Sequence, residues 1–298
     1  MGNDATRQNK IVDGLLNVFF IALSILIIAP FVLIISVSLT DESTLMTYGY
    51  SFLPKQISSL AYEFLFQTPL VLVRAYSNTF FITIIGTLLS ILMTSIIGYA
   101  ISRRDYSLRS PLTIFVFIPM MFSGGLVPFY ILMTQYLHLK NSLWAIILPG
   151  LISPFYILIM KGFMGKIPYE IIESAKMDGA SEWRIFFRII LPLSTPALAT
   201  LSLFIAFNYW NEWFNALLFI DDDKLVPLQL LLVRIMNTLD FLRNNSQYIQ
   251  GLGIDMSQFP NESVRMALVV LVAGPMMFVF PFFQRYFVQG MTVGSLKG

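Results

Sequence analysis

The sequence predicts an all-α polytopic membrane protein with six transmembrane helices, and three observations support this fold class. Of the 298 residues, 56% are hydrophobic and only 12% are charged, whereas about a quarter of the residues in a typical soluble domain are charged. Six segments are apolar over the roughly 20 residues that a helix needs to cross the hydrocarbon core. The connections between them differ in Lys and Arg content, which is the usual sign of a fixed orientation in a membrane.

The six predicted spans comprise residues 15–39, 79–101, 111–136, 143–160, 196–220 and 264–283. The first apolar stretch is longer than the core of a signal peptide, so we expect it to be a retained anchor. The third and fourth spans contain helix-breaking residues, namely Pro119, Gly124, Gly125, Pro128, Pro149 and Pro154. Breaks at membrane depth persist only where protein or a water-filled cavity satisfies the freed backbone groups, so these two spans are predicted to be internal.

Lys and Arg are unevenly distributed between the two sets of span ends. One set carries twelve, namely Arg7, Lys10, Arg103, Arg104, Arg109, Lys161, Lys166, Lys176, Arg184, Arg188, Arg285 and Lys297. The other set carries seven over a longer stretch of chain, namely Lys55, Arg74, Lys140, Lys224, Arg234, Arg243 and Arg265. Because positive loops stay on the cytoplasmic side, both termini are predicted to be cytoplasmic. The loop 161–191 and the tail 284–298 then lie inside, and the loops 40–78 and 221–263 lie outside.

The composition argues against several kinds of chemistry. The sequence has no Cys and a single His, His138, which excludes disulfides and thiolate metal sites and leaves almost no basis for a histidine-based site. It contains no Gly-x-x-x-x-Gly-Lys-Ser/Thr loop for nucleotide phosphates. We therefore expect this chain to have no catalytic residue, no metal site and no bound cofactor.

The loop 161–191 is longer than a tight connection between neighbouring helices requires, and its residues predict two short helices. Pro168 suits the first turn of one helix, and Gly179 can end it in a left-handed conformation. Ser181 can cap the second helix. The first helix carries acidic and apolar side chains, namely Glu170, Glu173, Ile171, Ile172, Ala175 and Met177. It could lie on the lipid surface, but its acidic residues favour docking to a protein.

The amino-acid sequence of this loop resembles the EAA loop of ABC importer permeases. The sequence Glu-Ser-Ala-Lys-Met-Asp-Gly occupies residues 173–179, and Ile189 and the pair Leu191-Pro192 follow at the family's spacing. In that family the loop is the coupling helix, which inserts into a cleft of the ATPase subunit. The resemblance implies ATPase contacts by Glu173, Ser174, Ala175, Asp178, Gly179 and Ala180. Glu173 and Asp178 would supply charge, and Gly179 would permit close backbone approach. Ser174 departs from the usual Ala, which is a change between two small residues.

The C-terminal sequence Gln-Gly-Met-Thr-Val-Gly-Ser-Leu-Lys-Gly is similar to the tail of the carbohydrate branch of this family, of which a maltose-transporter permease is typical. The sequences of residues 178–180 and 186–192 resemble the same branch. The outer segment 48–65 resembles permeases for polysaccharide fragments more than it resembles the maltose permease. By this resemblance, a flexible tail reaches the ATPase dimer through Gly290, Thr292, Gly294, Lys297 and Gly298. A frayed terminus without function is the alternative.

The fifth predicted span carries the most polar intramembrane face. Asn208, Asn211, Glu212 and Asn215 are spaced so that one continuous helix would place them on a single stripe. Amides, a carboxylate and aromatic rings suit the hydroxyls and apolar faces of a sugar. Our hypothesis for the substrate path comprises Asn208, Tyr209, Asn211, Glu212, Trp213 and Asn215. The alternative is structural, since such polar groups also fasten helices together and Trp also marks the membrane interface.

The resemblance implies the type I ABC importer permease fold and a function in sugar or oligosaccharide import, with a polysaccharide fragment as one candidate. It implies four kinds of partner: a second permease that is a different chain, an ABC ATPase dimer holding ATP and Mg, an extracytoplasmic sugar-binding protein, and lipid. No nucleic acid is expected. The implied location is a bacterial cytoplasmic membrane, and 251–253 is our candidate for a loop tip that probes the binding protein. The alternatives are a permease for amino acids or ions, or a secondary transporter.

Overall fold

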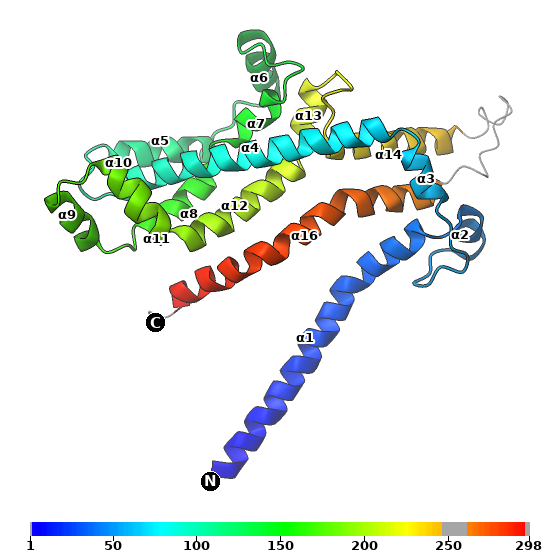
Figure 1. Ribbon diagram of the computed structural model, residues 1–298, viewed down its shortest axis with the longest axis horizontal. Helices are drawn as coiled ribbons and strands as arrows, with labels where there is room; N and C mark the ends of the chain where they lie inside the picture. The colour runs from blue at the N-terminus through cyan, green and yellow to red at the C-terminus, as the bar shows by residue number, and fades with distance from the viewer. Residues whose placement is uncertain (1, 246–260, 296–298) are drawn as a thin grey trace. The chain divides into compact units, whose positions relative to one another are not determined.

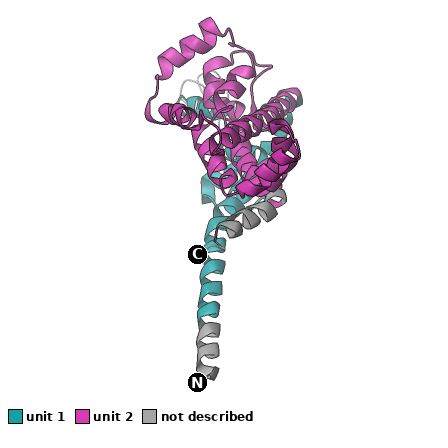
Figure 2. Ribbon diagram, turned by 90° about the vertical axis from the view of Figure 1, so that its left-hand side faces the viewer, with its two compact units in different colours: residues 1–69, 235–273 teal, residues 70–234, 274–298 magenta. Residues whose placement is uncertain are grey.

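The computed structural model of the chain describes residues 2–245 and 261–295. It divides the chain into two compact units, Met1–Pro69 with Ile235–Ala273 and Leu70–Arg234 with Gly274–Gly298 (Figure 2). The regular structure of the described residues is helical, and one isolated β-bridge pairs Thr40 with Ile57. The predicted all-α class is therefore confirmed.

The helices are labelled in Figure 1. Their bounds are α1 (Gly2–Ser38), α2 (Glu42–Tyr48), α3 (Leu60–Phe66), α4 (Pro69–Ser102), α5 (Arg109–Met121), α6 (Leu126–Ile131), the π-helix η1 (Leu132–Tyr136), α7 (Trp144–Gly150), α8 (Pro154–Met164), α9 (Tyr169–Met177), α10 (Glu182–Ile185), the π-helix η2 (Phe186–Ile190), α11 (Leu191–Leu193), α12 (Thr195–Trp210), α13 (Phe214–Phe219), α14 (Leu228–Asn244) and α16 (Asn261–Ser295).

By length and composition, three helices in the described part of the chain can each cross a membrane: Val12–Ser38, Pro69–Ser102 and Asn261–Val279. Three bent helix pairs bring the number of candidate spans to six if each pair counts as one. Two of the pairs confirm the predicted breaks, because Arg109–Met121 and Leu126–Tyr136 meet at 112° and Trp144–Gly150 and Pro154–Met164 meet at 47°. The proline and glycine residues in these segments are the local cause.

The fifth predicted span is not one continuous helix. Helix α12 ends at Trp210, and α13 begins only at Phe214. Between them the Glu212 carboxylate accepts a hydrogen bond of 2.9 Å from the backbone N–H of Asn215. A side chain that hydrogen-bonds nearby backbone groups competes with the hydrogen bonds of the helix. Because the helix is interrupted here, the prediction that Asn208, Asn211, Glu212 and Asn215 form one stripe on a continuous helix is wrong.

Other helix ends also differ from the predicted span limits. Helix α4 begins at Pro69, ten residues before the predicted start at position 79. Helix α16 continues to Ser295, beyond the predicted span end at position 283. Gly290 and Gly294 do not interrupt α16, since an isolated glycine costs a helix only about 1 kcal/mol relative to alanine. The segment 221–263, which was predicted to be an outer loop, contains α14.

Two apolar clusters organise the second unit. One surrounds α9 and joins Tyr99, Met160, Ile172, Ala175 and Phe186 with other buried residues. The other joins residues of α4, α7, α12 and α13, which pack against the segment that leads into α14. The first cluster positions α9, and the second positions the polar residues of the proposed substrate path.

In the first unit, a buried carboxylate caps the start of α16. Glu42 is only 7% exposed, and its oxygens accept hydrogen bonds from the backbone N–H of Glu262 at 2.9 Å and from that of Ser263 at 3.1 Å. The Ser263 hydroxyl donates a third bond of 2.8 Å. The first N–H groups of a helix have no partner within it, so Glu42 satisfies two of them and its negative charge suits the helix N-terminus.

We expect Glu42→Ala to destabilise the chain by about 2 kcal/mol, because it leaves buried N–H groups of α16 without an acceptor. Glu42→Gln should cost less, since its amide oxygen still accepts hydrogen bonds. The measurement is the thermal unfolding midpoint of the purified chain in detergent, with Glu63→Ala at an exposed position as the matched control. Equal midpoints for Glu42→Ala and Glu63→Ala would show that this cap contributes nothing.

Candidate coupling and substrate-path sites

The predicted pair of short helices in the loop 161–191 is present. Pro168 precedes α9, and Gly179 follows it with a φ of 75°. The N–H of Ala180 donates to the carbonyl of Ala175 and that of Gly179 donates to the carbonyl of Lys176, both at 3.0 Å. These two bonds form a Schellman motif, which requires a left-handed residue at the glycine position. The Ser181 hydroxyl caps α10 by accepting from the N–H of Arg184 at 3.4 Å.

Helix α9 has one packed face and one free face. Ile172 and Ala175 are 5% and 9% exposed and lie in the apolar cluster around α9. Among the residues assigned to ATPase contact, Glu173, Ser174, Asp178 and Gly179 are exposed, and Ala180 is half-buried. Ala175 therefore anchors the helix, while the exposed residues form the face available to a partner.

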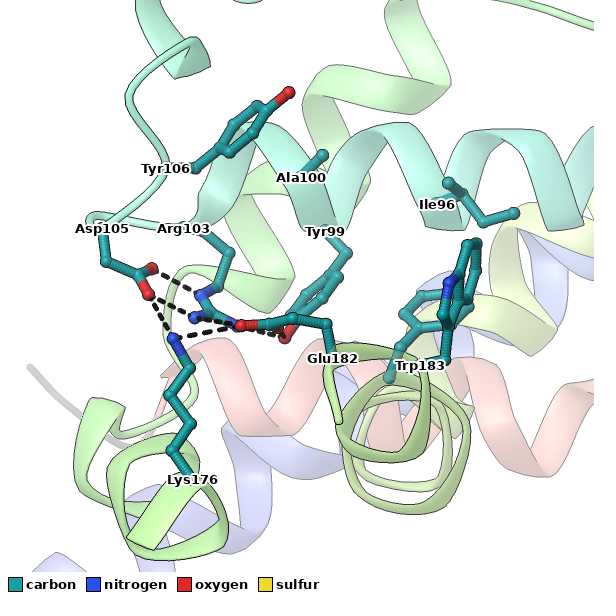
Figure 3. A pocket seen from close by; sticks show the side chains of 10 residues that line it. Ile96, Tyr99, Ala100, Arg103, Asp105, Tyr106, Lys176, Glu182 and Trp183 are labelled. Atoms are coloured by element: carbon teal, nitrogen blue, oxygen red, sulfur yellow. Dashed lines mark hydrogen bonds and ion pairs between the residues drawn. The ribbon is translucent and has the colours of Figure 1, made fainter. Parts of the chain in front are cut away.

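A closed ring of four charged residues lies at the edge of the packed face of α9, one turn after Ile172. We call Arg103, Asp105, Lys176 and Glu182 the four-charge ring (Figure 3). Arg103 binds Asp105 with two hydrogen bonds of 2.7 and 2.5 Å and donates to Glu182 at 2.8 Å. The Lys176 ammonium completes the ring at 2.6 Å from Asp105 and 3.0 Å from Glu182. Each cation thus contacts both anions.

The ring holds the pKa of its acids low and that of its bases high. Hydrogen bonds from Arg103 and then Lys176 hold the pKa of Asp105 well below its ordinary value of 3.8. Burial acts to raise the pKa of Glu182, but its hydrogen bonds with Lys176 and Arg103 lower it below 4.5. Hydrogen bonds to Asp105 and Glu182 raise the pKa of Lys176 above 10.5. All four members therefore stay charged at neutral pH.

The directions of these shifts predict how the docking of α9 depends on pH. The carboxyl groups have lowered pKa values in the folded chain, so their stabilisation is present above about pH 4.5 and is lost as the pH falls through those values. Lys176 has a raised pKa, so its stabilisation is lost only as the pH rises through a value above 10.5. Amide hydrogen exchange in α9, corrected for the intrinsic rate, should show constant protection between about pH 5 and pH 10. Loss of protection between pH 6 and pH 8 would contradict this expectation.

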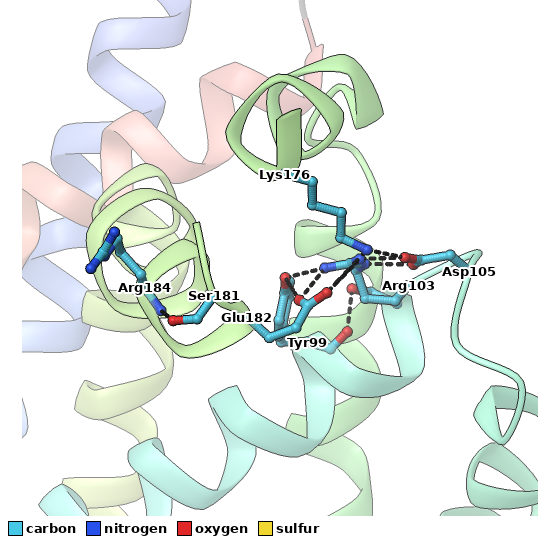
Figure 4. A network of polar contacts seen from close by, with 8 residues as sticks. Tyr99, Arg103, Asp105, Lys176, Ser181, Glu182 and Arg184 are labelled. Atoms are coloured by element: carbon cyan, nitrogen blue, oxygen red, sulfur yellow. Dashed lines mark hydrogen bonds and ion pairs between the residues drawn. The ribbon is translucent and has the colours of Figure 1, made fainter. Parts of the chain in front are cut away.

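This ring was not predicted from the sequence. Arg103 and Lys176 were considered as positive charges that set the orientation, and Lys176 also as part of the loop motif, but Asp105 and Glu182 were not singled out. The four residues come from two loops that are about 70 positions apart in the chain. Neither loop contains a spacing that predicts the other, so only the folded chain brings them together (Figure 4).

The polar residues of the proposed substrate path surround one cavity of about 650 Å³. Its polar lining comprises Ser153, Tyr156, Asn208, Tyr209, Asn211, Glu212 and Asn215. The non-helical residues between α7 and α8 and those between α12 and α13 both border it. Irregular backbone at membrane depth is tolerated where it lines a water-filled cavity. The cavity therefore accounts for how the two helix breaks can exist within predicted spans.

Hydrogen bonds hold the polar groups of this cavity in place. The Asn208 amide donates to the Tyr156 hydroxyl at 2.8 Å. The Asn211 side-chain oxygen accepts from Gln229 at 2.9 Å. Tyr156 and Gln229 were not predicted, because each lies on a different helix from the polar segment. Trp213 is 41% exposed and is not among the described residues that line the cavity, so the structure separates it from the other five.

Tyr209 lines the cavity but mainly joins helices. It is 6% exposed, and its hydroxyl donates to the carbonyl of Ile147 at 2.9 Å and lies 3.0 Å from the Ser90 hydroxyl. A Cβ atom at Gly86 would lie 2.7 Å from the Tyr209 ring, and one at Gly150 would lie 2.9 Å from its hydroxyl. Glycine is needed at both positions because the ring packs directly against the backbone of α4 and α7.

The predicted tail is described only in part. Gly290, Thr292 and Gly294 belong to α16, where a flexible segment had been expected. Lys297, Gly298 and the candidate loop tip 251–253 lie outside the described residues.

Apolar helices and broken spans that border a polar cavity are typical of an integral-membrane transport protein. The family model of the binding-protein-dependent transport system inner membrane component matches residues 86–293. The chain therefore belongs to this family and is a permease of a binding-protein-dependent ABC importer.

Named relatives agree with this assignment. The chain is 36% identical over 297 residues to the polygalacturonan/rhamnogalacturonan transport system permease protein YtcP of Bacillus subtilis, covering 98% of this chain and all of the relative. A crystal structure of a bacterial ABC transporter involved in import of the acidic polysaccharide alginate matches with a TM-score of 0.79 and 26% identity, over 94% of this chain and 98% of that one. The alginate transporter in complex with an alginate pentasaccharide-bound periplasmic protein shares the fold, with a TM-score of 0.54, 16% identity and 93% of each chain covered.

Proposed function

We propose that this chain passes an oligosaccharide, cut from a polysaccharide, into the cytoplasm of a bacterium, driven by ATP hydrolysis on partner subunits. The observation that carries the proposal is the cavity bordered by the two helix breaks. Its amides, hydroxyls and aromatic rings can contact the hydroxyl groups and apolar faces of a sugar. The substrates named for YtcP and for the alginate transporter are polysaccharides, which supports the same class.

The charge of the cavity narrows this substrate class. Glu212 is the acidic residue of the lining, and no Lys or Arg is among the described residues that border the cavity. A uronate carboxylate would meet a negative side chain here without a compensating cation. We therefore expect the hydroxyl-rich faces of the saccharide, and not its acidic groups, to contact this chain.

The proposed complex contains this chain, a second permease that is a different chain, a dimer of ABC ATPase subunits and an extracytoplasmic sugar-binding protein, with lipid around the spans. ATP and Mg are assigned to the ATPase subunits, and this chain binds no cofactor. Its exposed α9 face, with Glu173, Asp178 and Gly179, supplies the ATPase contact. The C-terminal residues Gly290–Gly298 supply a second contact.

The excess of Lys and Arg at one set of span ends supports an orientation with both termini in the cytoplasm. Helix α9 then faces the cytoplasm and the segments 40–78 and 221–263 face outward. The membrane is the cytoplasmic membrane of a bacterium, crossed several times by the chain.

Purification of a tagged chain from its own host tests this function. A P-loop ATPase and a second permease should copurify, and the complex in liposomes should hydrolyse ATP faster when its binding protein carries an oligosaccharide derived from polygalacturonan, rhamnogalacturonan or alginate. Amino acids and inorganic ions should have no effect. Uptake without an ATPase, driven by an ion gradient, would instead identify a secondary transporter.

A further inference from the structure

We propose that the four-charge ring locks the coupling helix α9 to the last turn of α4, so that a displacement of α9 is transmitted to α4. This inference rests on the proposed function, because it concerns how movement of the docked helix reaches the membrane-spanning part of the chain. The proposal assigns a positioning role to the four residues of the ring. The coupling-loop motif does not assign this role to any residue.

The ring joins three separate elements. Arg103 directly follows α4, which ends at Ser102, and Asp105 lies in the connection to α5. Lys176 lies in the last turn of α9, and Glu182 is the first residue of α10. Within the second unit, α9 and α10 lie beside this end of α4 (Figure 1). The ring thus connects a candidate membrane span with both short helices of the loop.

Tyr99 extends the connection into α4 itself. Its hydroxyl accepts a hydrogen bond from Arg103 and donates one of 3.2 Å to Glu182. Its ring packs against Phe186 with centroids 5.4 Å apart. The ring of charges is therefore fastened to the last turn of α4 as well as to the residue that follows it.

A buried arginine distinguishes this ring from an ordinary surface ion pair. The Arg103 side chain is 6% exposed, whereas the side chains of Asp105, Lys176 and Glu182 are 31%, 37% and 55% exposed. Exposed single ion pairs contribute little to stability. A network that contains a bidentate arginine can contribute more, because its geometry is well determined. A buried arginine that loses a partner is left with an uncompensated charge, so small displacements of α9 relative to α4 are opposed.

The apolar contacts of α9 cannot supply this restraint by themselves. Ile172 and Ala175 hold the helix against Met160, Ile185 and Phe186, but apolar burial is not directional. Lys176 lies one turn after Ile172 and faces two carboxylates at 2.6 and 3.0 Å. Hydrogen-bonded charges have defined distances and angles. The ring therefore limits how far α9 can slide or rotate against the apolar cluster on which it packs.

The test uses the complete transporter in liposomes and the double variant Lys176→Gln/Glu182→Gln. This change removes one positive and one negative charge and leaves Arg103 paired with Asp105, so the net charge is unchanged. Substrate transported per ATP hydrolysed should fall about five- to tenfold, which is the size of a typical coupling between sites. The ATPase subunits should remain bound and should still hydrolyse ATP.

A conservative variant and a matched control separate charge from bulk structure. Lys176→Arg/Glu182→Asp retains the charges and should restore most of the transport per ATP. Lys140→Gln/Asp221→Gln removes another ion pair, of 2.7 Å, which is exposed and lies away from α9. That control should behave as the unmodified chain. Unchanged transport per ATP in Lys176→Gln/Glu182→Gln would overturn the proposal.

A second measurement does not depend on the transport assignment. In the purified full-length chain, Lys176→Gln/Glu182→Gln should reduce the hydrogen-exchange protection of the α9 amides, while the protection of α12 stays the same. Unchanged protection of α9 would overturn the proposal by itself. If no ATPase binds even the unmodified chain, the proposed function fails, and this exchange measurement still decides whether the ring holds α9.

Discussion

Gly179→Arg is expected to lower substrate uptake about a hundredfold while the chain remains in the membrane, equivalent to about 3 kcal/mol of lost docking free energy. Gly179 ends α9 at a φ of 75°, on the exposed face assigned to the ATPase. Apart from Gly179 and its two chain neighbours, no heavy atom of the described residues lies within 4 Å of a Cβ at Gly179, so the added side chain starts in open space. The arginine would extend into the space that we propose for the docked ATPase.

Backbone strain is the competing explanation, and two controls address it. Gly49 has a φ of 73° and equally open surroundings, but it lies in the segment 40–78, which is predicted to face outward. Gly49 also has a ψ of −168°, a backbone region that is essentially restricted to glycine. Gly49→Arg therefore carries at least as much backbone strain as Gly179→Arg, without touching the docking face. Gly179→Asn tolerates the conformation better and should retain most uptake. Wild-type uptake by Gly179→Arg would refute the assignment of this face to the ATPase.

Asn208→Ala combined with Glu212→Ala is expected to lower uptake at limiting substrate about tenfold or more, because two polar contacts of about 1 kcal/mol each are lost. Both side chains border the 650 Å³ cavity. The expected change is in substrate selectivity and rate, with the ATPase subunits still bound. The measurement is uptake of a series of oligosaccharides that differ in length and in acidic groups.

The structural interpretation predicts a different result for the same variant. Asn208 also bonds Tyr156, and Glu212 also bonds the N–H of Asn215, so a purely structural role should lower the thermal unfolding midpoint and leave selectivity intact. Asn237→Ala with Glu63→Ala removes one exposed amide and one exposed carboxylate outside the cavity. This control should change neither quantity. A lower midpoint with unchanged selectivity would assign Asn208 and Glu212 to helix packing.

The breaks in the third and fourth spans were predictable because proline and glycine act locally. Gly124 and Gly125 lie in the bend between α5 and α6, and Pro154 begins α8 directly after the bend that follows α7. The break after Trp210 was not predictable in this way. It arises where Glu212 caps α13, in a segment with no proline or glycine. A hydrophobic run therefore predicted that this segment enters the membrane but not its internal geometry.

The sequence by itself determined the class of the protein, its candidate spans and the helix-turn-helix of the coupling loop. Hydrophobic length, glycine conformation and capping are properties of neighbouring residues, so they can be recognised in a linear sequence. Only the tertiary structure decided that Asn208, Asn211 and Glu212 still meet at one cavity after their helix breaks, and that Arg103 and Asp105 close a ring with Lys176 and Glu182. The physical reason is that charged and polar side chains interact according to distance in space, and the packing of α4, α9 and α12 sets those distances.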